Sequence, residues 1–110
     1  MSENLFDDSN LTEFVYLKYD DENQLIVGIT DELENMETKV SNGKYGEQHY
    51  LVTKNGLLKI DSVRLRRALK DCIEGIRSTV KSGKLIFPLA FLITRKGTGF
   101  KTMYRVEQSK

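Results

Sequence analysis

The stretch from Lys84 to Glu107 constrains the fold most, because it holds the longest apolar run of the chain and a glycine-rich turn. Apolar side chains fill both alternating sets of positions from Leu85 to Ile93, as in a strand that is covered on both faces. The turn lies at residues 96–99, where Gly97 and Gly99 can adopt positive φ values. The return strand is expected to set one aromatic and apolar face against a largely cationic one, with Phe100, Thr102, Tyr104 and Val106 opposed to Lys101, Met103, Arg105 and Glu107.

The N-terminal half predicts a second hairpin. Glu13 to Tyr19 is rich in aromatic and β-branched residues, and Asp20 to Asn23 has the composition of a turn. Gln24 to Ile29 is expected to be the partner strand, with Gly28 as a bulge where the sheet curves. A hairpin is therefore expected to open the fold, after polar residues 1–10 that we expect to be loosely held.

The middle of the chain gives weaker signals. Thr30 to Val40 fits either a short helix or a long acidic loop, and residues 42–46 are typical of a flexible connection. Gln48 to Thr53 predicts a strand. The Asn55-Gly56 turn then predicts a short return segment over residues 57–60.

One helix is predicted from Ser62 to Ser82, with Asp61 or Ser62 as the N-cap and Gly83 ending it. Its apolar stripe has helical spacing and consists of Leu65, Leu69, Cys72, Ile73, Ile76 and Val80. The other face is basic and carries Arg64, Arg66, Arg67, Lys70, Arg77 and Lys81. Gly75, inside the helix, is interpreted as a point of close packing against the sheet.

A short resemblance lies in the C-terminal turn. Residues 95–104 follow the pattern K/R-x-G-x-G-x-x-T-x-Y and resemble the hairpin near the C-terminus of phage-type single-stranded DNA-binding proteins built on an OB-fold. The resemblance covers these ten residues and, beyond them, only the order of the elements. It implies a hairpin in the barrel wall beside the nucleic-acid groove, with Arg95, Lys96, Lys101 and Tyr104 near the bound strand.

The fold class that follows is α+β and mainly β, in a single domain over residues 1–110. The sheet is expected to be either an OB-like small barrel or a curved antiparallel sheet, with one long helix before a C-terminal β-hairpin. The helix is longer than the compact barrel needs.

The residues needed for most catalytic chemistry are scarce. His49 and Cys72 are the only histidine and the only cysteine, which excludes an intrachain disulfide and, unless these two residues meet, a His/Cys metal site or nucleophile pair. We expect His49 to be half-buried and Cys72 to act as a small buried hydrophobe. Acidic pairs at residues 7–8, 20–22 and 31–32 could bind Mg²⁺, but solvated turn residues are the ordinary interpretation. No enzymatic activity, catalytic residue, metal or cofactor is therefore expected.

The net charge of +1 conceals a strong segregation of charge. Residues 1–38 hold eleven acids and one base, whereas residues 39–110 hold sixteen bases and five acids. The acidic third could neutralise the basic part within the fold, or it could leave a basic groove elsewhere to attract an anionic ligand.

Binding to a single strand needs cations along the phosphates and flat rings for the bases. The aromatic candidates are Tyr16, Tyr19, Tyr45, Tyr50, Phe100 and Tyr104. The predicted nucleic-acid-binding residues are Lys44, Tyr45, Lys54, Arg95, Lys96, Lys101, Tyr104 and Arg105. Strand alternation predicts that Phe100 and Tyr104 are either both in the core or both stacking platforms.

The sequence thus favours a non-catalytic protein that binds single-stranded nucleic acid, with DNA as the expected form, and that resembles phage or mobile-element replication proteins. The alternative is a small phage or mobile-element protein-interaction module, a regulator or inhibitor acting through its acidic N-terminal third or its helix face. A homodimer is a further expectation. The sequence shows neither a signal peptide nor a run of apolar residues long enough to span a membrane, so we expect the cytoplasm, or the host cytoplasm for a viral protein, and no membrane partner.

Overall fold

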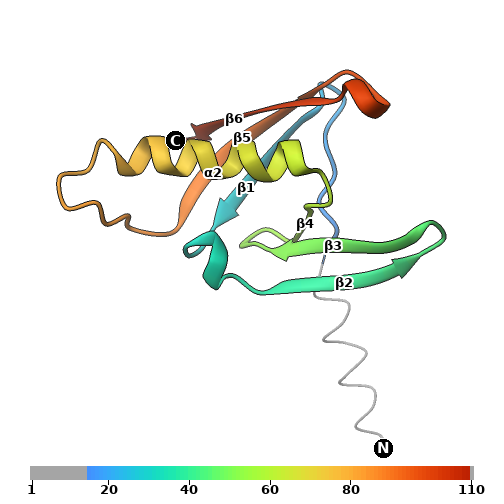
Figure 1. Ribbon diagram of the computed structural model, residues 1–110, viewed down its shortest axis with the longest axis horizontal. Coiled ribbons are helices and arrows are strands. Elements are labelled where there is room, and N and C mark those ends of the chain that lie inside the picture. Colours follow the sequence, from blue (N-terminus) through green and yellow to red (C-terminus); the bar gives the residue numbers. More distant parts are fainter. Residues whose placement is uncertain (1–14, 110) are drawn as a thin grey trace, which may run out of the picture.

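The structure is a computed structural model that describes residues 15–109, and these form two separate three-stranded antiparallel sheets (Figure 1). Sheet one has the order β1-β5-β6, with β1 at Gln24–Ile29, β5 at Leu89–Lys96 and β6 at Met103–Ser109. Sheet two has the order β2-β3-β4, with β2 at Thr38–Gly43, β3 at Gly46–Val52 and β4 at Leu57–Lys59. The predicted class, α+β and mainly β, is confirmed. Residues 15–109 do not close into a barrel, which was one of the two forms expected for the sheet.

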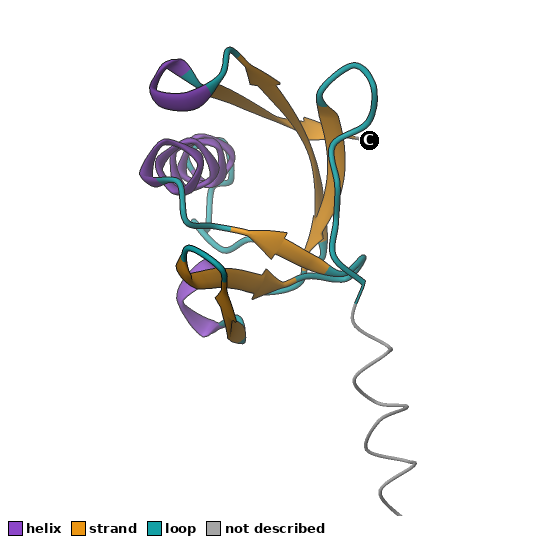
Figure 2. Ribbon diagram, turned by 90° about the vertical axis from the view of Figure 1, so that its right-hand side faces the viewer, coloured by secondary structure: helices purple, strands orange, loops and turns teal. Residues whose placement is uncertain are grey.

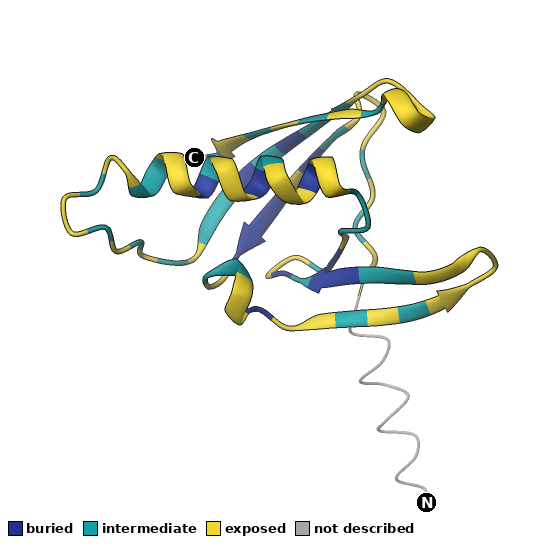
Figure 3. Ribbon diagram, viewed as in Figure 1, coloured by how far each residue is buried: buried dark blue, intermediate teal, exposed yellow. Residues whose placement is uncertain are grey.

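Helix α2 (Val63–Arg77) supplies the second layer of the fold. Figure 2 shows it on the inner side of sheet one and above sheet two. The core lies where the three parts meet, and it is the dark blue region in Figure 3. Its fully buried side chains are Val27, Ile29, Leu58, Leu69, Phe91 and Ile93.

Strand β1 has the predicted bounds, but its partner is β5, with Val27 opposite Phe91. The prediction that a hairpin opens the fold is therefore wrong. Residues 15–19, which we call the strap, run extended instead and bridge to β4. Leu17 donates its N–H to the Leu57 carbonyl at 2.9 Å, and Leu57 donates to the Val15 carbonyl at 2.7 Å. Pairing with β5 sets Val27 of β1 beside Phe91 on one fully buried face, whereas the strap offers only the half-buried Leu17 and Tyr19.

The expectations for residues 1–10 and for Glu13 and Phe14 lie outside the described residues. The turn at Asp20 to Asn23 is confirmed: the Asn23 N–H donates to the Asp20 carbonyl at 2.9 Å, and Asn23 has φ of +60°.

Gly28 is not a bulge, because the register runs through it unbroken opposite Ala90. Its carbonyl accepts from the Lys54 N–H at 3.0 Å, and its N–H donates to Asn55 Oδ1 at 2.8 Å. A Cβ at this position would lie 3.0 Å from the Lys54 Cβ. The glycine thus lets the β3–β4 turn dock on β1, which joins the two sheets.

Residues 30–46 were poorly predicted. A short 3₁₀ turn, η1 (Leu33–Asn35), is followed by β2, so that neither a helix nor a long loop fills Thr30 to Val40. The expected flexible connection is the end of β2, a two-residue turn and the start of β3. The predicted strand, turn and return segment over residues 48–60 are confirmed.

Helix α2 begins as predicted, with the Leu65 N–H donating to Ser62 Oγ at 3.3 Å. It ends at Arg77, five residues before the predicted end at Ser82. Residues 78–82 form turns, and Arg77 donates to the Gly83 carbonyl at 3.0 Å. Polar Ser78 and Thr79 both turn back to donate to helix carbonyls at 2.7 Å, which is how such side chains compete with helix propagation.

The predicted stripe of α2 is buried at Leu65, Leu69 and Ile73 and half-buried at Cys72 and Ile76. The interpretation of Gly75 is wrong. It is exposed, and a Cβ added there would meet no atom within 4 Å, so it marks no close packing against the sheet.

The C-terminal hairpin is confirmed with shorter strands. β5 starts at Leu89, and the connection spans residues 97–102 with a second 3₁₀ turn, η2 (Gly99–Lys101). Gly97 and Gly99 have φ of +84° and +58°, as the turn required. Only one face of β5 is fully buried, because Phe91 and Ile93 enter the core while Leu92 on the outer face is half-buried. No helix among residues 15–109 is long and apolar enough to cross a membrane.

Candidate nucleic-acid interface

Both hairpin tips project from the same end of the molecule, the right-hand end in Figure 1 that faces the viewer in Figure 2. The β5–β6 tip comprises residues 96–101, and the β2–β3 tip comprises residues 43–46. The start of α2 lies between the two tips, and the strap runs from β4 to the start of β1 behind them. This end therefore combines elements from across the sequence.

The β5–β6 tip presents an almost free aromatic ring on a fixed backbone. Phe100 is 98% exposed, and Lys96 and Lys101 beside it are exposed. Arg64, from the first turn of α2, donates to the Phe100 carbonyl at 2.9 Å and to the Thr102 carbonyl at 2.8 Å. These bonds hold the loop against the helix while the ring points into solvent.

The β2–β3 tip repeats this combination. Tyr45 is 89% exposed, and the Lys44 Nζ lies 5.8 Å from the centre of its ring. Gly46 follows with φ of +113°, which permits the tight reversal.

A cluster of two tyrosines and an arginine lies between the tips. The Arg95 guanidinium carbon is 4.3 Å from the centre of the Tyr19 ring, and the Tyr19 and Tyr104 ring centres are 6.4 Å apart. Arg95 also donates to Asn23 Oδ1 at 3.1 Å. The Tyr19 hydroxyl is buried and has no hydrogen-bond partner among residues 15–109. Burial and the neighbouring Tyr104 raise the pKa of Tyr19 to about 12, and Arg95 opposes that rise.

These side chains form part of a pocket of about 390 Å³, which we call the tyrosine pocket; it is lined by Tyr19, Lys59, Asp61, Ser62, Arg95 and Tyr104. A neighbouring pocket of about 360 Å³ shares Ser62 and Tyr104 with it and reaches Phe100. The two pockets thus adjoin each other, one beside the β5–β6 tip and the other beside the strap.

Aromatic and basic side chains continue from the strap along sheet two. Tyr16 is half-exposed and meets the buried Tyr50 edge-on, with ring centres 5.1 Å apart. Tyr50 pairs across the sheet with Lys39 on one side and Lys59 on the other. Neighbours of this kind share one face of a sheet. Tyr50, Lys39 and Lys59 thus share one face of sheet two, the sheet whose β2–β3 tip carries Lys44 and Tyr45.

The structure brings six of the eight predicted binding residues to this end: Lys44, Tyr45, Arg95, Lys96, Lys101 and Tyr104. Arg105 and Lys54 lie on the outer face of sheet one. Arg105 is opposite Thr94 on the neighbouring strand, and its Nη2 lies 3.8 Å from Glu107 Oε2. The Lys54 side chain lies over Gly28.

The prediction that Phe100 and Tyr104 share one environment is wrong. Phe100 belongs to η2 and is exposed, whereas Tyr104 is in β6, half-buried against the core. The 3₁₀ turn breaks the strand alternation on which the prediction depended.

Sequence reasoning missed the roles of Lys59, Asp61 and Arg64 at this end. Asp61 had been considered only as a helix cap, and Arg64 only as part of a solvated helix face. Their contacts join residues far apart in the chain, so no local pattern marks them.

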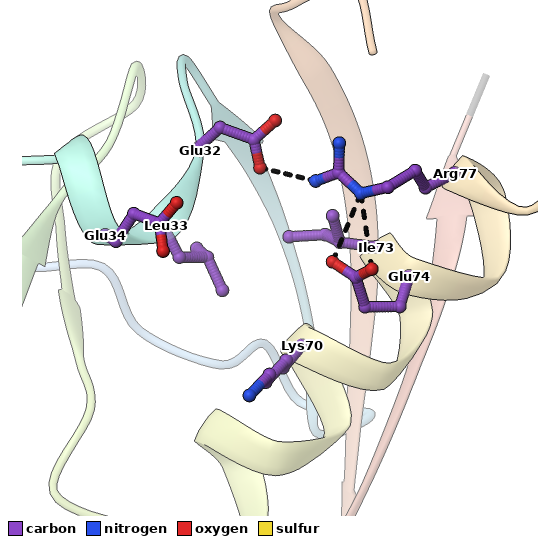
Figure 4. Close-up of a pocket in the computed structure, with 7 residues that line it drawn as sticks. All are labelled: Glu32, Leu33, Glu34, Lys70, Ile73, Glu74 and Arg77. Atoms are coloured by element: carbon purple, nitrogen blue, oxygen red, sulfur yellow. Dashed lines mark hydrogen bonds and ion pairs between the residues drawn. The ribbon is translucent and has the colours of Figure 1, made fainter. Parts of the chain in front are cut away.

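Acidic residues gather on another side of the fold. Glu32 binds Arg77 at 2.5 Å and Glu74 binds it at 3.2 Å, and these hydrogen bonds, with Glu32 the stronger, raise the pKa of Arg77. They line a pocket of about 610 Å³ between η1 and α2 (Figure 4). At least this part of the acidic third is thus neutralised within the fold. Nowhere in residues 15–109 do three or more His, Cys, Asp or Glu side chains form a group able to hold a metal ion.

Comparisons with protein-family models, with curated proteins and with solved structures found no match. What the interface can do therefore follows from its side chains. Exposed rings can stack on planar groups, and lysines beside them can neutralise anions.

Proposed function

We propose that this protein binds single-stranded nucleic acid, with DNA as the expected form, along the end that carries the two hairpin tips and the strap. The observation that carries the proposal is the pair of exposed rings, Phe100 and Tyr45, each beside at least one lysine on a turn with defined geometry. The fold gains no stability from leaving these rings exposed, since an aromatic ring stabilises a fold only when it is buried. A base stacked on such a ring contributes about 1–3 kcal/mol.

A single strand fits this end better than a duplex does. Its bases are unpaired and can turn toward the protein, whereas the bases of a duplex are stacked on each other. The rings at the tips, together with Tyr104 and the exposed Tyr16, offer separate stacking surfaces. Arg95 is already bound to Tyr19 and Asn23, so the phosphates are expected to depend mainly on Lys44, Lys96 and Lys101.

The first test is titration of a fluorescent oligothymidine at several salt concentrations. Each phosphate contact on a single strand contributes about 0.7 to the slope of log affinity against log salt. Joint replacement of Lys44, Lys96 and Lys101 by alanine should therefore flatten the slope by about 2. Lys81→Ala and Lys84→Ala, in the exposed loop at the opposite end, are the matched control and should leave the slope unchanged.

The second test separates stacking from charge. Phe100→Ala and Tyr45→Ala should each lower affinity by about 1–3 kcal/mol at an unchanged salt slope. Ile86→Ala is the control, because Ile86 is equally exposed but lies in the loop at the opposite end. If oligothymidine does not bind at about 50 mM salt, where non-specific binding is strong, the proposal fails.

A second candidate function is a protein-interaction module. It is favoured by an apolar groove of about 280 Å³ between α2 and sheet two, with Leu33, Leu51, Ile60 and Leu69 on its floor and Arg66 and Lys70 at its rim. This function would be established instead if the intact protein retains a partner that a Lys70→Glu variant does not retain. Neither protein should then bind oligothymidine.

A further inference from the structure

One carboxylate, that of Asp61, lines the tyrosine pocket in the middle of the proposed cationic path. It is held in place by His49, whose ring Nδ1 lies 2.9 Å from Oδ1 and whose backbone N–H is shared by both carboxylate oxygens at 3.1 Å. Burial by itself would raise the pKa of Asp61, but the hydrogen bonds from His49, together with the nearby charges of His49 and Lys59, outweigh it and lower the pKa. Asp61 is therefore ionised at neutral pH.

The orientation of Asp61 leaves acceptor capacity on the carboxylate. A carboxylate offers about four lone-pair sites. Oδ1 accepts two hydrogen bonds from His49, whereas Oδ2, within the described part of the chain, accepts only the shared backbone N–H. The side chain is 32% exposed and borders the pocket, so Oδ2 has room for a donor from a ligand.

A negative group here repels phosphates and suits the N–H donors of a base. Lys59 lies close to Asp61, and it is exposed, so an ammonium donor stands beside the carboxylate acceptor. The Tyr104 ring, half-buried in the same pocket, gives a base a surface to stack on. Of the four bases, only guanine offers a ring N–H and an amino group side by side, followed by a carbonyl oxygen, on its Watson–Crick edge. The pair Asp61 and Lys59 matches that order of two donors and one acceptor.

We propose that the tyrosine pocket takes a guanine base of the bound strand, with the free side of Asp61 Oδ2 accepting from both its N1–H and its N2 amino group, Lys59 donating to O6, and Tyr104 stacking on the ring. The pocket volume of about 390 Å³ lies within the range of ligand pockets. This inference rests on the proposed single-strand binding and adds a base preference to it.

The experiment compares two labelled oligonucleotides of equal length, one all-thymidine and one with a single central guanosine, binding to the full-length chain. A good bidentate contact discriminates between bases by about 5- to 150-fold. The guanosine strand should bind tighter by a factor in that range. An inosine strand, which lacks the N2 amino group, should lose most of the gain.

Asp61→Asn tests the role of the carboxylate, because the amide keeps an oxygen for His49 but loses the charge and one acceptor. It should abolish the guanine preference and at the same time tighten oligothymidine binding, since a charge that repels phosphate is gone. A purely structural role would weaken both ligands equally. Asp71→Asn, an exposed acid on α2, is the control and should change neither affinity.

Lys59→Gln gives a second measurement in case Asp61→Asn does not fold, and it should reduce the guanine preference as well as the overall affinity. Equal affinity of the wild-type protein for the two strands would overturn the guanine site while single-strand binding stands. The same conclusion follows if the variants weaken both strands in equal proportion. Failure of the wild-type protein to bind either strand would instead refute the proposed function, and the guanine site with it.

Discussion

The two sheets are alike in strand number and differ in how the chain builds them. Sheet one pairs β1 with β5 across a long separation, with Gln24 opposite Thr94, and its inner face is completely buried at Val27, Ile29, Phe91 and Ile93. Sheet two joins three consecutive strands by short turns, and β2 has no buried residue. Sheet one provides most of the core, whereas sheet two adds Leu51 and Leu58 to it and extends its β2–β3 tip into solvent.

This difference separates the part of the fold that provides stability from the part that we propose for binding. A long-range pairing costs loop entropy, which only a well-packed apolar face repays. A local hairpin costs less to form and can place its tip in solvent. The proposed interface uses the β2–β3 tip of sheet two and the β5–β6 tip of sheet one, where β5 and β6 leave the core.

The largest expected effect on stability is in the centre of sheet one. Phe91→Ala should lower the free energy of unfolding by about 3–5 kcal/mol, because it leaves a cavity among fully buried neighbours. Leu92→Ala, on the outer face of the same strand, is the control and should cost about 1 kcal/mol. Urea unfolding measures both. Similar losses for the two variants would show that the outer face is also covered in solution.

The two tips allow a matched comparison of glycines. Gly97 has φ of +84°, and an added Cβ would lie 2.5 Å from the Lys101 carbonyl oxygen, whereas Gly46 has φ of +113° and open space around it. Gly97→Ala should therefore cost about 2–3 kcal/mol and Gly46→Ala only about 1 kcal/mol. Thermal unfolding of both variants would reveal the order. A larger loss for Gly46→Ala would mean that the β2–β3 tip is the more constrained of the two.

A smaller effect is expected from the clamp on the β5–β6 tip. Arg64→Ala removes two exposed hydrogen bonds to carbonyls and should cost about 1 kcal/mol of stability. Binding should fall more than stability, because the ring of Phe100 loses its fixed position. Oligothymidine titration alongside urea unfolding tests this. Unchanged affinity would show that the β2–β3 tip, which no side chain of residues 15–109 clamps in this way, sets the binding strength.

The smallest change is expected at the buried hydroxyl of the strap. Tyr19→Phe removes a hydroxyl without a partner and should raise stability by about 0.5–1 kcal/mol at neutral pH. Burial raises the pKa of Tyr19 to about 12, above the value of 10 in an unfolded chain, so the wild-type protein should lose stability between pH 10 and pH 12.

The Tyr19→Phe variant should lack that component of the alkaline loss. Unfolding curves at pH 8, 10 and 11 for both proteins provide the comparison. A variant that loses as much stability as the wild-type protein would place the alkaline transition elsewhere, for example in sheet two.

Local patterns determined several elements from the sequence by themselves. The bounds of β1, the start of α2 after Asp61 or Ser62, its buried stripe through Leu65 and Leu69, and the positive φ values of Gly97 and Gly99 are all fixed by neighbouring residues. The sequence also shows directly that lysines stand beside Tyr45 and Phe100. Each of these signals depends on interactions within a few residues, which a sequence displays directly.

The tertiary structure decided what those elements meet. The pairing of β1 with β5 instead of with the strap, the docking of Lys54 and Asn55 on Gly28, and the placing of Phe100 and Tyr45 at one end all depend on contacts across many residues. β1 pairs with β5 because β5 is the most apolar strand available to it. The positions of the exposed tips then depend on how the two sheets are arranged. Asp61 shows the same limit: its position in sequence suggests a helix cap, and only the fold brings it beside His49, Lys59 and the tyrosine pocket. Burial of apolar surface does not depend on sequence separation, so the partners it selects cannot be identified from local patterns alone.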